Sequence, residues 1–251
     1  MDYTINFQAH MVLNTAAIAI QKIPDLSNKF VIVIDSGGRW WDLVADAINN
    51  WEIKPPEHIY LNFGVDGKTY KPEWSISWNK IPIPKETIIW NFVIQNHFKE
   101  LFSEKAENKN GIIIFDDDFY TGKTANILKK YLIKALKKPV YLLAINKANR
   151  NLRKDIYLTG CTIDPFASIL GGDGEWNKLK GVIHPIYDKN IEVIDSNGFT
   201  LKKKESVVDP ELEKSYREWQ SKVRTTTREK IYEMKKRNER PKIIHKIFWG
   251  Y

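Results

Sequence analysis

Runs of consecutive apolar residues, each followed by polar or small residues, constrain the fold of this chain most strongly. They lie in FVIVIDSGG (30–38), GIIIFDDD (111–118) and VYLLAIN (140–146). A run that is apolar at every position, without alternation, is typical of a strand buried on both faces, as in a parallel sheet. HIYLNFGV (58–65) predicts a further strand.

Segments with helical periodicity alternate with these strands. Apolar residues recur at three- and four-residue steps in RWWDLVADAINNW (39–51), and helices are also predicted over 9–22, 88–105 and 124–137. Alternating strands and helices favour an α/β fold, with a mainly parallel sheet flanked by helices in a Rossmann-like arrangement. Trp40 and Trp41 are expected in the core of this fold rather than against a nucleobase.

The C-terminal region differs from the rest of the chain. Residues 150–200 show little regularity, whereas 209–240 predict a long, highly charged helix with one apolar stripe. We therefore expect an α/β domain over 1–200 and a C-terminal helical extension over 201–251. The extension is expected to pack on that domain or on a partner.

Composition limits the partners and the compartment. The net charge of +8 suits an anionic partner, but the basic residues are spread along the chain, which favours a solvated surface. A single cysteine, Cys161, excludes an intramolecular disulfide and a cysteine-based zinc site. No apolar run approaches the ~20 residues of a membrane span, and the N-terminus lacks a signal-peptide pattern. A cytoplasmic protein without a membrane partner is expected.

The segment IIIFDDDFYTGKTA (112–125) is the most informative for function. A buried strand would deliver Asp116 and Asp117 to the carboxyl edge of the sheet, where ligands of open α/β folds bind. The turn Thr121–Thr124 then opens a helix, whose backbone N–H groups and dipole favour a phosphate. Gly122 would let the backbone approach that phosphate closely. Because carboxylates repel phosphate, the two acids must face hydroxyl groups or an accompanying cation.

A nucleotide P-loop is excluded as an explanation of this segment. The residues GKT at 122–124 match the end of the pattern G-x-x-x-x-G-K-[ST], but Asp117 stands where its first glycine is required.

The segment resembles the phosphoribosyl-diphosphate motif of type I phosphoribosyltransferases. In that motif, four apolar residues, two acids and a short spacer precede Thr-Gly-x-Thr. The resemblance implies that Asp116 and Asp117 hold the ribose 2- and 3-hydroxyls. It also implies a cradle for the 5-phosphate made of Tyr120, Thr121, Gly122, Lys123 and Thr124.

Two other segments extend the resemblance over roughly residues 28–190. The end of the first strand is similar to the family's diphosphate loop, which would here comprise Asp35, Ser36, Gly37, Gly38 and Arg39. The long connection at 66–87 resembles the mobile catalytic loop that closes over the substrate. The catalytic candidates implied are Lys68, Tyr70 and Arg39.

The resemblance implies a Mg²⁺-dependent transferase that moves 5-phosphoribosyl from phosphoribosyl diphosphate (PRPP) to a nucleobase-like nitrogen and releases diphosphate. The Mg²⁺ would arrive with PRPP and contact the protein through Asp116 and Asp117 at most. Tyr120 departs from members acting on 6-oxopurines, which place an Asp there. Ser36 stands where many members have a basic residue.

These departures keep other functions open. One is a non-catalytic regulator that senses PRPP or a nucleotide, with nucleic acid as a disfavoured further partner. Another is a nucleotide-sugar or nucleoside enzyme with a catalytic carboxylate elsewhere, for which Asp164, Asp173 and Glu175 are available. A homodimer is an open alternative to a monomer.

Overall fold

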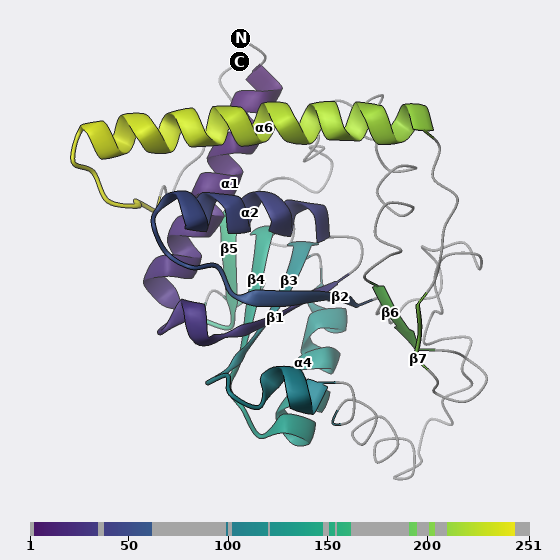
Figure 1. Cartoon of the computed structure of the whole chain (residues 1–251). Coiled ribbons are helices and arrows are strands. Elements are labelled where there is room, and N and C mark those ends of the chain that lie inside the picture. The colour runs from purple at the N-terminus through teal and green to yellow at the C-terminus, as the bar shows by residue number, and fades with distance from the viewer. Residues whose placement is uncertain are drawn as a thin grey trace.

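A computed structural model describes residues 3–34, 38–61, 99, 102–119, 121–147, 151–153, 155–161, 191–194, 201–203 and 210–243. Its sheet has the strand order β5-β4-β3-β1-β2-β6-β7 (Figure 1). The strands are β1 (Phe30–Ile34), β2 (Glu57–Leu61), β3 (Ile112–Asp118), β4 (Val140–Asn146), β5 (Tyr157–Cys161), β6 (Ile191–Ile194) and β7 (Leu201–Lys203). The helices are α1 (Tyr3–Lys22), α2 (Gly38–Asn50), α4 (Lys123–Leu136) and α6 (Pro210–Lys236), with a 3₁₀ turn, η1, at Leu26–Asn28.

The predicted fold class is confirmed. Every neighbouring pair from β5 to β6 is parallel, and β7 alone runs antiparallel, next to β6. Helices cover both faces of the sheet (Figure 1). The structure is therefore an α/β arrangement of the Rossmann-like kind with a C-terminal helix.

Side chains alternate between the two faces of the central strands, and each face has its own apolar core. Val31 and Val33 of β1 and Phe115 of β3 pack against α1 and α2. Phe30 and Ile32 of the same strand β1 pack on the other face, in a cluster that includes the apolar residues of α4. Burial of both faces explains why these strands are apolar at every position.

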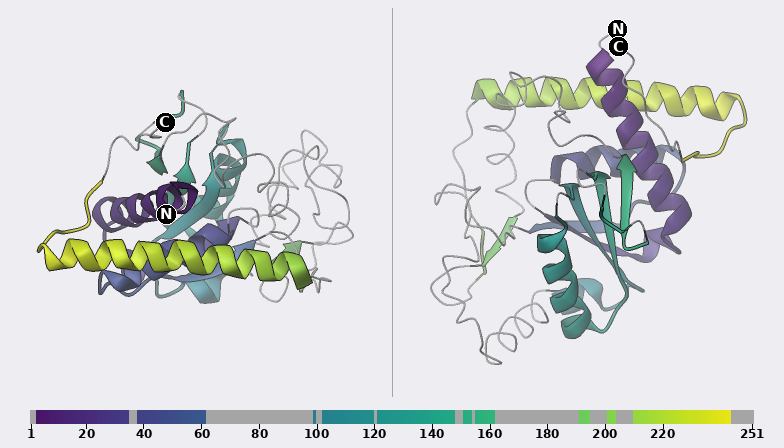
Figure 2. Two further views of the ribbon diagram at one scale, coloured as in Figure 1. Left: turned by 90° about the horizontal axis from the view of Figure 1, so that it is seen from above. Right: turned by 180° about the vertical axis from the view of Figure 1, so that it is seen from behind.

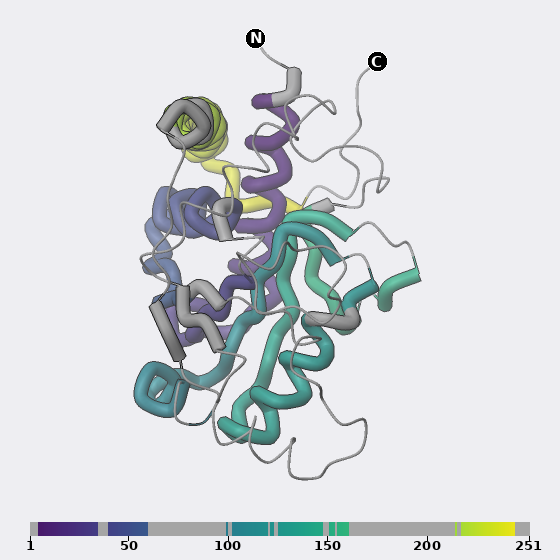
Figure 3. Tube along the Cα trace, turned by 90° about the vertical axis from the view of Figure 1, so that its right-hand side faces the viewer, coloured from purple at the N-terminus to yellow at the C-terminus, as the bar shows by residue number. Residues whose placement is uncertain are grey.

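Helix α6 forms an outer layer on the face covered by α1 and α2. It crosses α1 and runs along α2 (Figures 1 and 2), and α1 lies between α6 and strands β4 and β5 (Figure 3). Val223 and Ile231 of α6 are buried in the core formed with α1 and α2. The apolar stripe predicted for this helix is thus used, at these positions, for packing on the same chain.

Several elements extend or add to those predicted. Helix α1 begins at Tyr3, whereas the sequence predicted residues 9–22. Strands β5 and β6 lie within residues 150–200, where the sequence shows little regular periodicity. Of the helix predicted over 88–105, residues 102–106 are helical, and most of the remainder is outside the described residues.

Polar contacts hold the extended helix α1 against the sheet edge. The Asn14 side chain donates a hydrogen bond to the carbonyl of Gly160 in β5. A Cβ atom at Gly160 would collide with Thr15 of α1, so glycine permits this close approach. Among the described residues, no helix is long and apolar enough to cross a membrane.

Candidate functional site

The strand order has its topological switch point between β1 and β3. From β1 the chain continues to β2 on one side and later returns to β3 on the other side, so the connections diverge at this point. Ligands of open α/β sheets bind at such switch points, outside the carboxyl ends of the strands. Val33 pairs with Phe115, so Ile34 at the end of β1 lies beside Asp116 of β3.

Asp116 and Asp117 occupy this carboxyl edge in close contact. Asp116 is 8% exposed and Asp117 is partly exposed. The Asp117 N–H donates to Asp116 Oδ1 over 2.9 Å. Burial, and then the charge of Asp117, raise the pKa of Asp116 well above its usual value. Burial raises the pKa of Asp117 to about 6. The pair therefore retains a proton at a higher pH than two ordinary carboxyl groups would.

The third acid of the run has a structural partner. Asn146 at the end of β4 donates from Nδ2 to Asp118 Oδ1 over 3.3 Å. The Phe119 N–H donates to the Asn146 carbonyl over 3.1 Å, which continues the pairing of the two chain segments past the strand ends. Asp118 thus helps to fix the end of β3 against β4.

The turn into α4 has the geometry of an anion-binding helix terminus. Gly122 is the N-cap residue with φ 68° and ψ 5°, in the left-handed region that favours glycine. The N-cap glycine has no side chain with which to cap this terminus, and the first turn of α4 contains no acidic residue. The N–H groups of the first turn and the positive end of the helix dipole are the features that bind anions at a helix N-terminus.

Tyr157 of β5 packs directly on this turn, which the sequence did not predict. Its ring lies 5.2 Å from that of Phe119, edge to face, and Asn126 of α4 donates a hydrogen bond to its hydroxyl. A Cβ atom at Gly122 would collide with the Tyr157 ring. No local signal marks Tyr157, because it lies 35 residues after Gly122 in the sequence.

A second residue that the sequence did not single out is Lys147, which directly follows β4. It is only 2% exposed, and its Nζ donates to the Leu152 carbonyl over 3.0 Å. Lysine is seldom buried to this degree unless its ammonium group is paired. It places a cation at the edge of the sheet where Asp116 and Asp117 lie.

The structure describes only part of the other predicted site. Gly38 and Arg39 begin α2, directly after β1 and the segment 35–37, and no acidic residue lies in the first turn of α2. Lys123 and Thr124 begin α4, and Thr121 is exposed before it. The side chains of Arg39, Lys123 and Thr124 lie outside what the structure describes. Also outside it are Asp35, Ser36, Gly37, Lys68, Tyr70 and Tyr120.

Trp40 and Trp41 lie in the core, as predicted. Trp41 is fully buried, with its ring 5.1 Å from that of Phe115, and Trp40 makes an edge-to-face contact with Trp219 of α6 at 5.3 Å. The two rings thus join α2 to β3 and α6.

Comparison with known proteins adds no assignment to this geometry. No protein-family model matches the chain, and no curated protein shows significant similarity to it. A functional proposal therefore depends on the residues themselves.

Proposed function

We propose that this protein is a Mg²⁺-dependent phosphoribosyltransferase, which transfers 5-phosphoribosyl from PRPP to a nucleobase-like nitrogen acceptor and releases diphosphate. The observation that supports this most is the position of an acid pair at the end of β3, in the strand–turn–helix segment that opens α4 with a glycine N-cap at the β1/β3 switch point. A sugar phosphate needs such a site, with acceptors for its diol and donors for its monoester.

The turn at Thr121–Thr124 would hold the 5-phosphate. A helix terminus with a glycine N-cap and no acidic residue in its first turn offers N–H donors and a favourable potential to a dianion. The space that a side chain at Gly122 would need is filled by the Tyr157 ring, which supports the turn, so the phosphate would contact the N–H groups at the start of α4.

Asp116 and Asp117 would hold the ribose 2- and 3-hydroxyls. A carboxyl pair that shares a proton offers both a donor and acceptors, which suits two neighbouring hydroxyl groups. Asp117 is the more exposed of the two and would make the closer contact.

The second helix terminus of the switch point would serve the leaving group. Segment 35–39 joins β1 to α2, whose first turn also lacks an acidic residue. In the reaction the bond from the anomeric carbon to diphosphate oxygen breaks, with its electron pair leaving on diphosphate. A bond to the acceptor nitrogen forms, and that nitrogen loses a proton. Arg39, with Lys68 and Tyr70 from the 66–87 connection, would stabilise the leaving charge.

Magnesium would enter with the diphosphate. Among the described residues, no three side chains that could bind a metal ion lie together. Mg²⁺ that enters with a phosphate substrate typically needs only one or two carboxylates, because substrate oxygens and water complete its coordination. The partly exposed Asp117 is the described group best placed to contact it. Bound Mg²⁺ would neutralise the charge that develops on the leaving diphosphate.

Calorimetric titration with PRPP and Mg²⁺ tests the proposal. We expect saturable binding that Asp117→Asn weakens by about tenfold or more, since a hydrogen bond to a charged group contributes about 1.5–3 kcal/mol. Asp155→Asn is the matched control, because Asp155 is an exposed acid paired with Arg153. Absence of heat at about 1 mM PRPP, or equal losses in the two variants, would contradict the proposal.

A regulator that binds the same ligand without turnover is the second candidate. The outer surface of α6 carries exposed basic residues, including Lys214, Lys222 and Lys236, which suit a polyanion. Diphosphate release with any member of a nucleobase panel supports the enzyme. PRPP binding without release, together with RNA or DNA binding that weakens steeply with salt, supports the regulator.

A further inference from the structure

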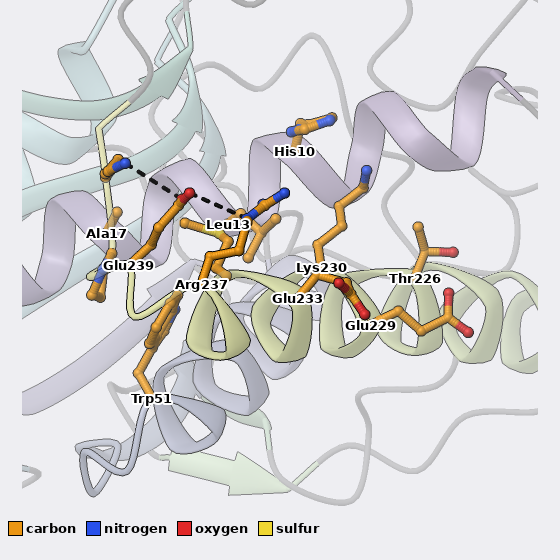
Figure 4. A pocket seen from close by; sticks show the side chains of 13 residues that line it. His10, Leu13, Ala17, Trp51, Thr226, Glu229, Lys230, Glu233, Arg237 and Glu239 are labelled. Atoms are coloured by element: carbon orange, nitrogen blue, oxygen red, sulfur yellow. Dashed lines mark ion pairs between the residues drawn. The ribbon is translucent and has the colours of Figure 1, made fainter.

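A cavity of about 550 Å³ lies between α1, α6 and the residue that follows α2, away from the β1/β3 switch point (Figure 4). Its size is within the range of small-molecule sites in proteins. The walls come from the side of α1 that faces α6, from the C-terminal half of α6, and from residues 239–242.

The floor of the cavity is apolar. Leu13 and Ala17 of α1, Trp51, Met234 of α6 and Pro241 contribute to its lining. An aromatic ring and aliphatic groups facing one space favour a flat apolar body, which would gain both burial and stacking.

The charged residues at one end of the cavity neutralise one another. Glu239 pairs with Arg237 over 3.2 Å and with Lys242 over 3.4 Å (Figure 4). Arg237 and Lys242 are also mostly exposed to solvent. A charged ligand group at this end of the cavity would therefore gain little electrostatic stabilisation.

Two basic groups at the other end lack such a partner among the described residues. Lys230 extends from α6 towards α1, on the side where His10 lies (Figure 4). Burial, and then the charge of Lys230, lower the pKa of His10. Burial lowers the pKa of Lys230, against a smaller, raising effect of the Glu229 charge. The nearby acids Glu229 and Glu233 are exposed, where water and salt screen their charges. An anion at this end of the cavity would offset the charge of Lys230 and favour the protonated form of His10.

We propose that this cavity binds a small organic anion with a flat apolar body, of the aromatic carboxylate class. The carboxylate would lie between Lys230 and His10, and the ring would lie against Trp51, Leu13 and Met234. The proposal does not depend on the function proposed for the switch point, since no residue is shared between the two sites.

Fluorescence and calorimetric titrations with 2-naphthoate and its uncharged analogue 2-naphthamide test this on the full-length protein. We expect the acid to bind about tenfold more tightly than the amide, and Lys230→Gln to remove that difference. Thr226→Trp, which adds bulk to a partly exposed position of the lining, is expected to weaken both ligands. Bound 2-naphthoate should also raise Tm, because a ligand of the folded state stabilises it.

Lys236→Gln is the matched control, because Lys236 is an exposed lysine of the same helix outside the cavity lining. Equal affinity for the acid and the amide overturns the proposal, as does no saturation by about 1 mM 2-naphthoate. Equal effects of Lys230→Gln and Lys236→Gln also overturn it. Thermal unfolding of each variant without ligand confirms that a lost affinity is not a lost fold.

Discussion

The Tyr157 ring occupies the space that a Cβ atom at Gly122 would need, with Tyr157 Cζ only 2.7 Å from the Cβ position. The two residues belong to β5 and to the start of α4. This contact fixes the residue type at position 122 independently of the left-handed backbone conformation found there.

Gly122→Ala is therefore expected to destabilise the protein by about 1–3 kcal/mol, from the positive φ and from overpacking. The proposed function adds that affinity for PRPP should fall, because the turn must shift. Urea unfolding and calorimetry measure the two effects. Asn126→Ala is the control, since it removes a hydrogen bond to the same tyrosine hydroxyl without adding an atom to the turn. Its expected cost is about 1 kcal/mol, and a larger loss than that of Gly122→Ala would contradict the steric explanation.

Asp117→Asn is expected to stabilise the protein in a pH-dependent way. The folded-state pKa of Asp117 is about 6, above the ordinary 3.8, so the folded protein binds this proton more tightly than the unfolded chain does. That contribution is full below the ordinary pKa and is lost as the pH rises through about 6. The variant should gain about 1–2 kcal/mol over the wild type at about pH 8, and much less at about pH 4.

Thermal unfolding across this pH range measures the effect, with Asp155→Asn as the exposed control. Burial of the charged acid pair is a cost to the fold, as is common where a carboxyl group serves a ligand. A gain for Asp117→Asn that is the same at both ends of the pH range would contradict the assignment.

Trp219→Phe tests how α6 is held on α1. The Trp219 Nε1–H donates to Gln8 Oε1 over 2.8 Å, and Gln8 is fully buried. Phenylalanine keeps an aromatic ring beside Trp40 but removes the donor, so we expect a loss of about 1–2 kcal/mol in urea unfolding. Tyr232→Phe, at a position of α6 that is 64% exposed, should leave stability unchanged.

Asp46→Ala tests how α6 is held on α2. Two nitrogens of the Arg228 guanidinium in α6 donate hydrogen bonds to the Asp46 carboxylate, and the Nε bond is 2.9 Å long. The Asp46 side chain is 16% exposed. Loss of this two-point contact should cost about 1 kcal/mol at low salt and less at high salt. Glu52→Ala is the matched control, because its ion pair with Lys235 is more exposed and should contribute less. Equal losses in the two variants would contradict the special role of Asp46.

The sequence predicted those elements whose signal is local and strong. The apolar runs of β1, β3 and β4 are visible because both faces of these strands are buried. Strand β5 has the sequence YLTGC, with Thr159 and Gly160 in place of apolar residues. Its stability comes from β4 beside it and α1 upon it, so its formation depends on tertiary contacts rather than on local sequence.

The candidate site follows the same division. Asp116, Asp117 and the turn at 121–124 form one continuous segment, so their pattern could be recognised before the fold was known. Tyr157 and Lys147 reach the same region only through the order of the strands. The cavity lined by Trp51 and Lys230 depends on how α6 lies across α1, which the periodicity of α6 does not specify.

Helix α2 starts at Gly38, next to the segment proposed to hold diphosphate, and is followed by Trp51, which lines the distal cavity. Its 13 residues span about 20 Å as a stiff rod. One end of this rod therefore borders the proposed diphosphate segment, and the other end borders the distal cavity. If both sites bind ligands, this helix is the direct structural connection through which binding at one could change affinity at the other.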